Sequence, residues 1–250
     1  MVKPLDKIRQ DDPWYTADQR AAAESPHQRR IIRKRIAFLL KAIDEFKASK
    51  TSPGPLRILD AGCGDGVLLK TLAELPNIQL FGVDYNPLRV QRAQARVPSA
   101  TVKEGDLTSL EFPNGSFDIV VISQVLEHIQ DDLVVLKDLA RVLNKTGWLL
   151  LGVPNEGCLL ARLRNHLLQP DIARTTDHVH FYTERTIRLL LDKAGLVVNS
   201  LMREGFFTPY LPLHSWFAAR EWGHRTLEGL GKVFPSQAAG VYLICMKRAG

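Results

Sequence analysis

Three aspartates close neighbouring apolar segments in the first half of the chain. Asp60 follows a segment with apolar residues at positions 56, 58 and 59, Asp84 ends the next apolar segment, and Asp106 follows the one after that. Glycines at positions 62, 64 and 66 come directly after Asp60, and glycine lets a backbone turn sharply and lets a ligand approach it. If the segments are parallel strands, their ends line one crevice. Carboxylates there repel phosphate, so we expect a positively charged, phosphate-free ligand.

Histidines supply the candidates for proton transfer, because an unperturbed imidazole titrates near neutrality. His128 comes shortly after the fourth apolar segment. Alternatively, its side chain forms a hydrogen bond to nearby backbone and has no role in proton transfer. His178 and His180 are two residues apart, so an extended strand would place both on one face. They could form a metal pair, but the sequence offers no evident third ligand, and we expect no metal ion.

Two acids accompany these histidines. Asp177 directly precedes His178 and could orient His178 or His180. Glu127 directly precedes His128 and could bind a cationic acceptor, although a surface salt bridge is the simpler interpretation.

The elements that must position these residues alternate along the chain. Apolar, strand-like segments alternate with segments of helical periodicity, a pattern that predicts a parallel, doubly wound sheet. Asn86 and Pro87 are typical of a helix start. We expect strands at residues 57–61, 80–84, 101–104, 118–123 and 148–153, and helices at residues 27–47, 67–75, 87–96 and 131–143.

The second half departs from this alternation. Leucines between residues 159 and 168 predict one helix that ends at Pro170, within an insertion that packs on the core, caps the substrate or meets a membrane. Thr183 caps a helix over residues 184–193, and strands follow at 196–202 and 241–246. Residues 206–234 are rich in aromatics that fill the core, wall a substrate pocket or form an oligomer face.

Composition limits the classes of protein. The chain has 250 residues, of which 45% are hydrophobic, which fits one large domain. It has no apolar run of the length that spans a bilayer and no apolar signal core, and its three cysteines are widely spaced, so we expect a cytoplasmic protein. The net charge is +6, and basic residues gather at positions 29, 30, 33, 34 and 35. This cluster is either a solvated helix face or a contact for an acidic partner.

The motif over residues 59–66, Leu-Asp-Ala-Gly-Cys-Gly-Asp-Gly, resembles the first motif of class I S-adenosylmethionine-dependent methyltransferases. The segments 105–107, 117–121 and 125–129 resemble later motifs of that family, and the resemblance covers residues 56–196, nearest to the ubiquinone-biosynthesis-like branch. It implies a Rossmann-like, doubly wound α/β sheet of seven strands, mostly parallel with an antiparallel last strand. We therefore expect one methyltransferase domain over residues 1–250: an N-terminal tail and helix (1–50), a cofactor-binding half (51–155), and a substrate-side half with helical insertions (156–250).

The resemblance also implies S-adenosylmethionine as the cofactor. Asp84 matches the acid that holds the ribose, the segment at Asp106 matches the adenine contact, and Gln124 would close over the methionine end. The expected cofactor-binding residues are Asp60, Gly62, Cys63, Gly64, Asp84, Tyr85, Asp106, Leu107 and Gln124.

The implied reaction is methyl transfer to a small-molecule or lipid-like acceptor at oxygen, with His128, His178 and His180 as catalytic candidates. A base is needed only where the acceptor carries a proton, as a hydroxyl does. An RNA methyltransferase and a non-catalytic cofactor-binding regulator are the alternatives. Contact with a membrane surface and a homodimer stay open.

Overall fold

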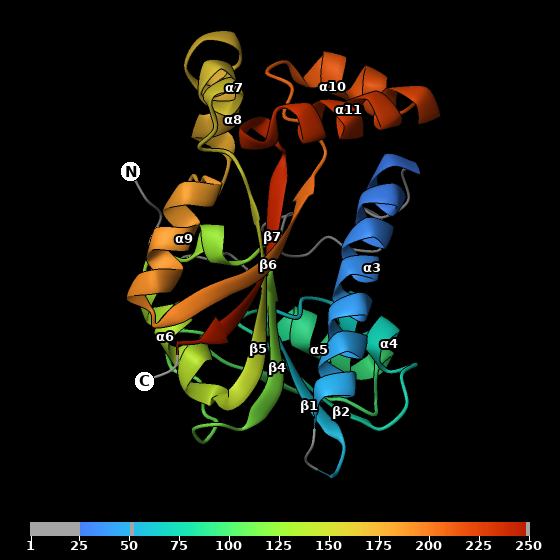
Figure 1. The fold of residues 1–250 in the computed structure, drawn as a ribbon, viewed down its shortest axis with the longest axis vertical. Coiled ribbons are helices and arrows are strands. Elements are labelled where there is room, and N and C mark those ends of the chain that lie inside the picture. Colours follow the sequence, from blue (N-terminus) through green and yellow to red (C-terminus); the bar gives the residue numbers. More distant parts are fainter. Residues whose placement is uncertain (1–25, 51–52, 249–250) are drawn as a thin grey trace.

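A computed structural model describes residues 26–50 and 53–248, and residues 1–25, with the N-terminal tail, lie outside the described part. Figure 1 shows a twisted sheet with helices on both faces and further helices beyond one end. The strand order is β3-β2-β1-β4-β5-β7-β6. All neighbouring pairs are parallel except those of β7, which runs antiparallel to both β5 and β6. The seven-stranded, mostly parallel sheet is therefore confirmed, and its strands are β1 (Leu56–Ala61), β2 (Ile78–Asp84), β3 (Thr101–Glu104), β4 (Phe117–Ser123), β5 (Leu143–Pro154), β6 (Leu196–Glu204) and β7 (Gly240–Lys247).

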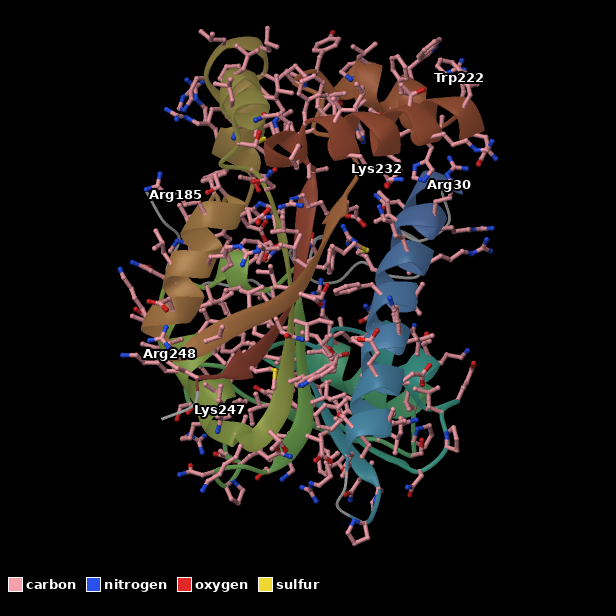
Figure 2. The ribbon with its side chains drawn as sticks, in the orientation of Figure 1. Arg30, Arg185, Trp222, Lys232, Lys247 and Arg248 are labelled. Atoms are coloured by element: carbon pink, nitrogen blue, oxygen red, sulfur yellow. The ribbon has the colours of Figure 1, made fainter. Side chains whose placement is uncertain are left out.

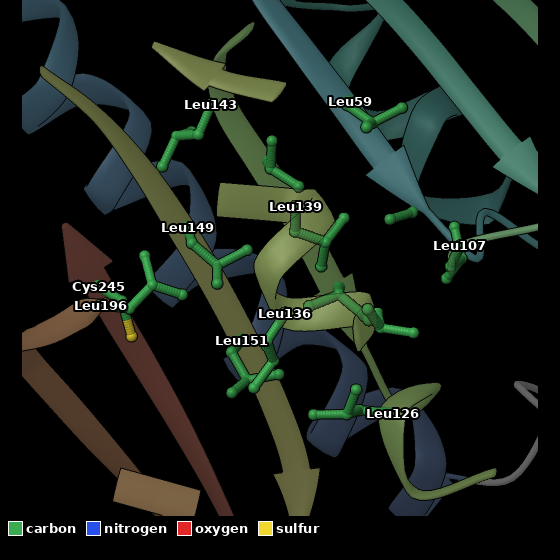
Figure 3. Close-up of a cluster of buried hydrophobic side chains, with 14 of the residues drawn as sticks. Leu59, Leu107, Leu126, Leu136, Leu139, Leu143, Leu149, Leu151, Leu196 and Cys245 are labelled. Atoms are coloured by element: carbon green, nitrogen blue, oxygen red, sulfur yellow. The ribbon is translucent and has the colours of Figure 1, made fainter. Parts of the chain in front are cut away.

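Helices cover the two faces of the sheet with separate apolar cores. Buried side chains of α3 (Pro26–Ser49), α4 (Val67–Leu72) and α5 (Pro87–Arg96) pack on one face. Those of α6 (Asp132–Val142) and α9 (Glu184–Lys193) pack on the other. Figure 3 shows this second core, where Leu136 and Leu139 of α6 lie against Leu149 and Leu151 of β5. Burial of apolar surface on both faces favours the strand–helix alternation of the first half.

Helix starts follow the residues that predicted them. The Asn86 side chain accepts hydrogen bonds from the amides of Leu88 and Arg89, and Pro87 occupies the first helical position of α5. Thr183 and Thr186 form a reciprocal capping box at the start of α9. These bonds satisfy amides that the helix itself leaves without a partner.

The insertions differ from the sequence prediction. The helix expected over residues 159–168 divides into α7 (Leu159–Leu163) and a π-helical turn (Arg164–Leu168). Pro170 begins a further helix, α8 (Pro170–Thr175), because its fixed φ suits a first helical position. Leu159 and Leu167 are 70% and 72% exposed, so these parts of the predicted apolar face do not pack on the core, whereas Leu160 packs against a small buried cluster of Cys158, Ala161 and Phe207.

The aromatic region forms two helices that the sequence did not predict, α10 (Leu211–Ala218) and α11 (Glu221–Val233). Phe207 is buried, whereas Trp216 and Trp222 are about half exposed and contact each other edge to face. Core filling therefore accounts for only part of this region. Figure 1 places α10 and α11 with α7 and α8 at the end of the molecule beyond the sheet. No helix among residues 26–50 and 53–248 combines the length and apolarity needed to cross a bilayer.

The basic cluster on α3 is not simply a solvated face. Arg35 makes two hydrogen bonds to the Glu204 carboxylate, from Nε to Oε1 at 3.0 Å and from Nη2 to Oε2 at 2.7 Å. Lys34 pairs with Glu228 of α11. Arg30 donates to the carbonyl oxygen of Ala218 and lies 3.6 Å from Glu221, beneath the α10–α11 pair in Figure 2. The cluster thus ties α3 to β6 and to the two C-terminal helices.

We predict that Glu204→Ala lowers the free energy of unfolding by about 2 kcal/mol, because it removes a buried, charge-assisted acceptor from Arg35. The matched control is Glu45→Ala, which breaks the exposed Lys41–Glu45 pair on α3, the helix that carries Arg35. This substitution should cost less than about 0.5 kcal/mol. Urea denaturation of both variants measures the difference. Equal midpoints for the two variants would contradict a clamping role for Glu204.

Candidate functional site

The glycine turn joins β1 to α4 at the carboxyl edge of the sheet. The amides of Gly62 and Cys63 both donate to the carbonyl oxygen of Val83, at 2.7 and 3.0 Å. Gly62, Gly64 and Gly66 all have positive φ, which glycine adopts without strain. A Cβ at Gly62 would lie 2.5 Å from Cγ2 of Val125. The space that glycine leaves at position 62 is therefore taken by Val125, not by an approaching ligand as the sequence suggested.

Two of the predicted aspartates meet beside this turn. Asp84 accepts hydrogen bonds from the amides of Gly64 (2.8 Å) and Asn86 (2.9 Å). Asp60 is 4% exposed, and its Oδ2 has no hydrogen-bond partner. Burial, reinforced by the negative charge of Asp84, raises the pKa of Asp60 to about 7. A positively charged ligand placed here would favour the ionised form of Asp60 and offset the repulsion.

The other predicted cofactor contacts lie along the same edge with their own local partners. Asp106 accepts a hydrogen bond from the amide of Thr108 at 2.8 Å, within its own turn. Leu107 is buried in the core, and Tyr85 is about half exposed after β2. Burial, together with the charges of Asp60 and Asp84, raises the pKa of the Cys63 thiol, so this thiol stays protonated and is a poor nucleophile.

A cavity of about 300 Å³ adjoins the turn and lies between α3 and the sheet. Asp60 and Gln124 line it together with apolar side chains of α3 and β5 and the ring of Tyr242. Gln124 has a φ of 57°, which is rare for a residue with a side chain, and its buried Nε2 has no hydrogen-bond partner. Asp60 thus offers an acceptor atom and Gln124 a donor atom that have no protein partner. A polar ligand would satisfy both atoms, and the amino-acid end of the expected cofactor carries groups that could do so.

The histidines lie at the rim that follows β4, and the structure pairs them differently from the sequence prediction. The rings of His128 and His178 are 4.7 Å apart, edge to face. Nδ1 of His128 lies 3.1 Å from Oδ2 of Asp177, and Nδ1 of His178 lies 2.6 Å from Oε2 of Glu156. Each ring therefore lies beside a carboxylate of its own, and the one beside His178 forms a hydrogen bond with it.

His180 is separated from this pair. Its Nε2 lies 3.1 Å from the carbonyl oxygen of Gln130 and 3.5 Å from Asp132, and its ring stacks on Tyr182. Residues 176–182 form no strand. The strand that would place His178 and His180 on one face is therefore not formed.

Backbone hydrogen bonds bring the two histidine segments together. The carbonyl oxygen of Glu127 accepts from the amides of Val179 (2.8 Å) and His180 (3.2 Å). The Glu127 side chain is 1% exposed, so the predicted surface salt bridge is also wrong. Burial raises the pKa of Glu127 despite the neighbouring histidines. Burial alone would lower the pKa of His178, but its bond to Glu156 outweighs that effect and raises it.

Sequence analysis missed Glu156, Arg35 and Tyr242. Glu156 is held in turn by Arg164, whose Nη2 lies 3.0 Å from its Oε1. The guanidinium of Arg35 lies 5.2 Å from the ring centre of Tyr242 at the cavity wall. Acids and bases that pair across such distances in the chain carry no local signal in the sequence.

Comparison with known proteins assigns the chain to a protein family. The sequence model of the family described as "Methyltransferase domain" matches residues 26–201. The chain is 35% identical over 98 residues to a protein of Mycolicibacterium smegmatis named probable S-adenosylmethionine-dependent methyltransferase, a match that covers 39% of this chain and 38% of that protein. It is 27% identical over 195 residues to the 2-methyl-6-phytyl-1,4-hydroquinone methyltransferase of Synechocystis, covering 76% of this chain and 61% of the relative. The chain thus matches less than two thirds of the length of either relative.

Solved structures share the fold. A methyltransferase of Methanosarcina mazei that is named as dependent on S-adenosylmethionine has a TM-score of 0.56 at 21% identity, covering 80% of this chain and 95% of that one. The cyclase SpnF has a TM-score of 0.58 at 18% identity, covering 84% and 81%. Because a cyclase shares the architecture, the fold alone does not give the reaction, which has to be argued from the site.

We predict that Asp84→Ala weakens binding of S-adenosylhomocysteine roughly 10- to 100-fold, because it removes a charged acceptor worth about 1.5–3 kcal/mol. The control is Glu104→Ala, which removes the exposed acid that ends the neighbouring strand in register with Asp84. Calorimetry measures both affinities, with circular dichroism as the check on folding. Unchanged affinity in a folded Asp84→Ala protein would contradict the assignment.

A second prediction concerns pH. Because the pKa of Asp60 is raised to about 7, most of this carboxyl is protonated at pH 6 and ionised at pH 7.5. A ligand ammonium prefers the ionised form, so affinity for S-adenosylhomocysteine should rise over this range with release of a proton. Titrations in buffers of different ionisation enthalpy measure that release. In Asp60→Asn the rise should disappear, and its persistence would assign the proton to another group.

Proposed function

The chain belongs to the family of class I S-adenosylmethionine-dependent methyltransferases, and we propose that it transfers the methyl group to a hydroxyl of a small-molecule or lipid-like acceptor. The observation that carries the acceptor chemistry is the His128–Asp177 pair at the rim beyond β4, where a carboxylate oxygen lies 3.1 Å from Nδ1 of the imidazole. A positioned imidazole of this kind suits removal of a proton from a hydroxyl.

The cofactor contacts are assigned by position along the edge of the sheet. Asp60 and Gln124, whose unpartnered atoms lie at the cavity, would hold the charged amino-acid end. Asp84 would hold the ribose hydroxyls with the lone pairs that its two backbone bonds leave. Tyr85, Asp106 and Leu107 would surround the adenine, and Gly62, Cys63 and Gly64 would supply the backbone wall.

S-adenosylmethionine, when bound, supplies a methyl group that its sulfonium already activates. The protein must then hold the acceptor in line with that methyl group and exclude water. His128 would accept the hydroxyl proton at the ring nitrogen opposite Nδ1, and Asp177 would stabilise the resulting imidazolium. His178, already bonded to Glu156, would contact the acceptor, and His180 would keep the segment in place.

Two observations support an apolar acceptor. The cavity has Ile32, Ile36, Phe38 and Leu150 among its walls. The relative from Synechocystis is named for a hydroquinone that carries a phytyl chain, which combines phenolic hydroxyls with a lipid tail. We therefore place a phenol with an apolar substituent first among the acceptor classes.

The helices beyond the sheet support a lipid-like acceptor in a different way. Leu159, Leu167, Trp216 and Trp222 are all exposed on these helices, and Figure 2 shows Trp222 at the outer end of α11. Exposed apolar side chains gathered at one end of a molecule are typical of contact with lipid or with another protein. These side chains would contact either a membrane surface that delivers the acceptor or a second copy of the chain.

The RNA alternative loses its support. Three of the five basic residues that suggested it, Arg30, Lys34 and Arg35, form ion pairs within the chain. Other basic residues lie on separate elements, such as Arg185 on α9, Lys232 on α11 and Arg248 after β7 (Figure 2).

We predict that His128→Gln leaves affinity for S-adenosylhomocysteine unchanged and slows methyl transfer about 10²-fold or more, the contribution expected of a general base. Asp177→Asn should slow transfer less, because the imidazole stays in place but loses its orienting charge. The control is His166→Gln, since His166 is exposed and lies outside the cluster. Transfer is measured as S-adenosylhomocysteine formed with a panel of alkyl-substituted hydroquinones and catechols.

Equal rates for wild-type and His128→Gln proteins would move the proton-accepting role to His178 or His180. Tight cofactor binding with no transfer to any member of the panel, or to wider amine and thiol panels, would favour the non-catalytic regulator.

A further inference from the structure

Glu127, His128 and His178 bring three metal-ligating atoms together. One carboxylate oxygen and one nitrogen from each ring all lie within 4.8 Å of one another. Glu127 and His128 come from the turn after β4, and His178 comes from the segment that the Glu127 carbonyl oxygen binds through two backbone amides. The backbone hydrogen bonds to the Glu127 carbonyl oxygen therefore bring the side chains of Glu127, His128 and His178 close together.

The Glu127 carboxylate is the observation that calls for a ligand. It is 1% exposed, and its Oε2 has no hydrogen-bond partner. A buried carboxylate oxygen without a donor is costly, so native proteins satisfy such atoms with a donor, a proton or a metal ion. The nearest side chains of the cluster are imidazoles, which are themselves metal ligands.

The surroundings of both imidazoles have the form of an outer coordination shell. Nδ1 of His178 is bound by Glu156, which Arg164 fixes, and Nδ1 of His128 faces Asp177. Metal-binding histidines nearly always give one ring nitrogen to a carboxylate or carbonyl, which sets the tautomer and leaves the other nitrogen for the metal. A simple internal ion pair needs one carboxylate, whereas here a separate carboxylate lies beside each of the two histidines.

We propose that Glu127, His128 and His178 bind one divalent transition-metal cation of the zinc or ferrous type. Two imidazoles and one carboxylate form a three-ligand set that leaves coordination positions open. The proposal replaces the expectation of no metal, which considered His178 with His180 and found no third ligand. The partner histidine is His128, and the third ligand is the carboxylate next to it in the chain.

The open positions connect this site to the acceptor, and this step rests on the proposed function. A hydroxyl oxygen bound to the cation would lose its proton to solvent more readily, because the cation lowers its pKa, and would be held at the rim as an anion. In the loaded protein His128 is then a ligand, and activation of the hydroxyl passes from the imidazole to the cation. The class of acceptor favoured is a phenol or catechol, whose oxygens bind such cations.

The test is calorimetric titration of Zn²⁺ into the metal-free full chain, without cofactor or acceptor, with visible absorption of bound Co²⁺ as a second readout. We expect one Zn²⁺ per chain. Glu127→Gln and His178→Gln should each abolish the stoichiometric binding or weaken it more than 100-fold. Glu156→Gln, which removes only the outer carboxylate, should weaken it roughly 10- to 100-fold. His166→Gln, at an exposed histidine outside the cluster, should bind as the wild type does.

Thermal unfolding of each variant identifies those that fold. If Glu127→Gln does not fold, the comparison with the wild type is made with Glu156→Gln. Failure to bind one Zn²⁺ per chain, or equal binding by the wild type and the folded cluster variants, would overturn the proposal and leave an internal ion pair in its place. The outcome is separable from the proposed function. Transfer that persists in a chelator would leave His128 as the base, whereas Zn²⁺ binding without any transfer would retain the metal site alone.

Discussion

The site is organised around two carboxylates of like charge that the sheet holds beside one turn. Asp60 and Asp84 end adjacent parallel strands, and the pairing of β1 with β2 fixes how far apart they lie. Burial, reinforced by the negative charge of Asp84, raises the pKa of Asp60 to about 7, so the unliganded protein carries an electrostatic cost at this edge. A cationic, phosphate-free ligand offsets that cost, whereas a pyrophosphate would increase it.

The acceptor side depends on a different kind of constraint. A single backbone oxygen, that of Glu127, accepts two amides from the segment that carries His178 and His180. This contact joins the turn after β4 to the segment that follows α8. It places each of two imidazoles next to a carboxylate and buries a third acid between the segments. Under the proposed function, chemistry at this rim would require the segment of residues 176–182 to be docked, while cofactor binding would draw mainly on residues before position 125.

Local signals were sufficient for the first half of the chain. The helix at 87–96 and the strand at 101–104 have the predicted bounds, because Asn86, Pro87 and an apolar alternation define them within a few residues. The positions of Asp60 and Asp84 followed from the same alternation. Local signals failed where distant segments decide the structure. Ion pairs anchor α11 to α3, a hydrogen bond from Arg30 to the Ala218 carbonyl oxygen anchors α10, and the partners of His128 and His178 lie 20 or more residues away. Spacing in the chain suggested His178 with His180, whereas tertiary contacts paired His178 with His128.

The most direct measurement of the central claim is a crystal structure of the chain with S-adenosylhomocysteine bound. The account predicts one ligand along the carboxyl edge, with its ammonium group within hydrogen-bond distance of Asp60 or Gln124 and its ribose hydroxyls on Asp84. A ligand held in a different hollow, with Asp60 and Asp84 contacting only protein atoms, would contradict it.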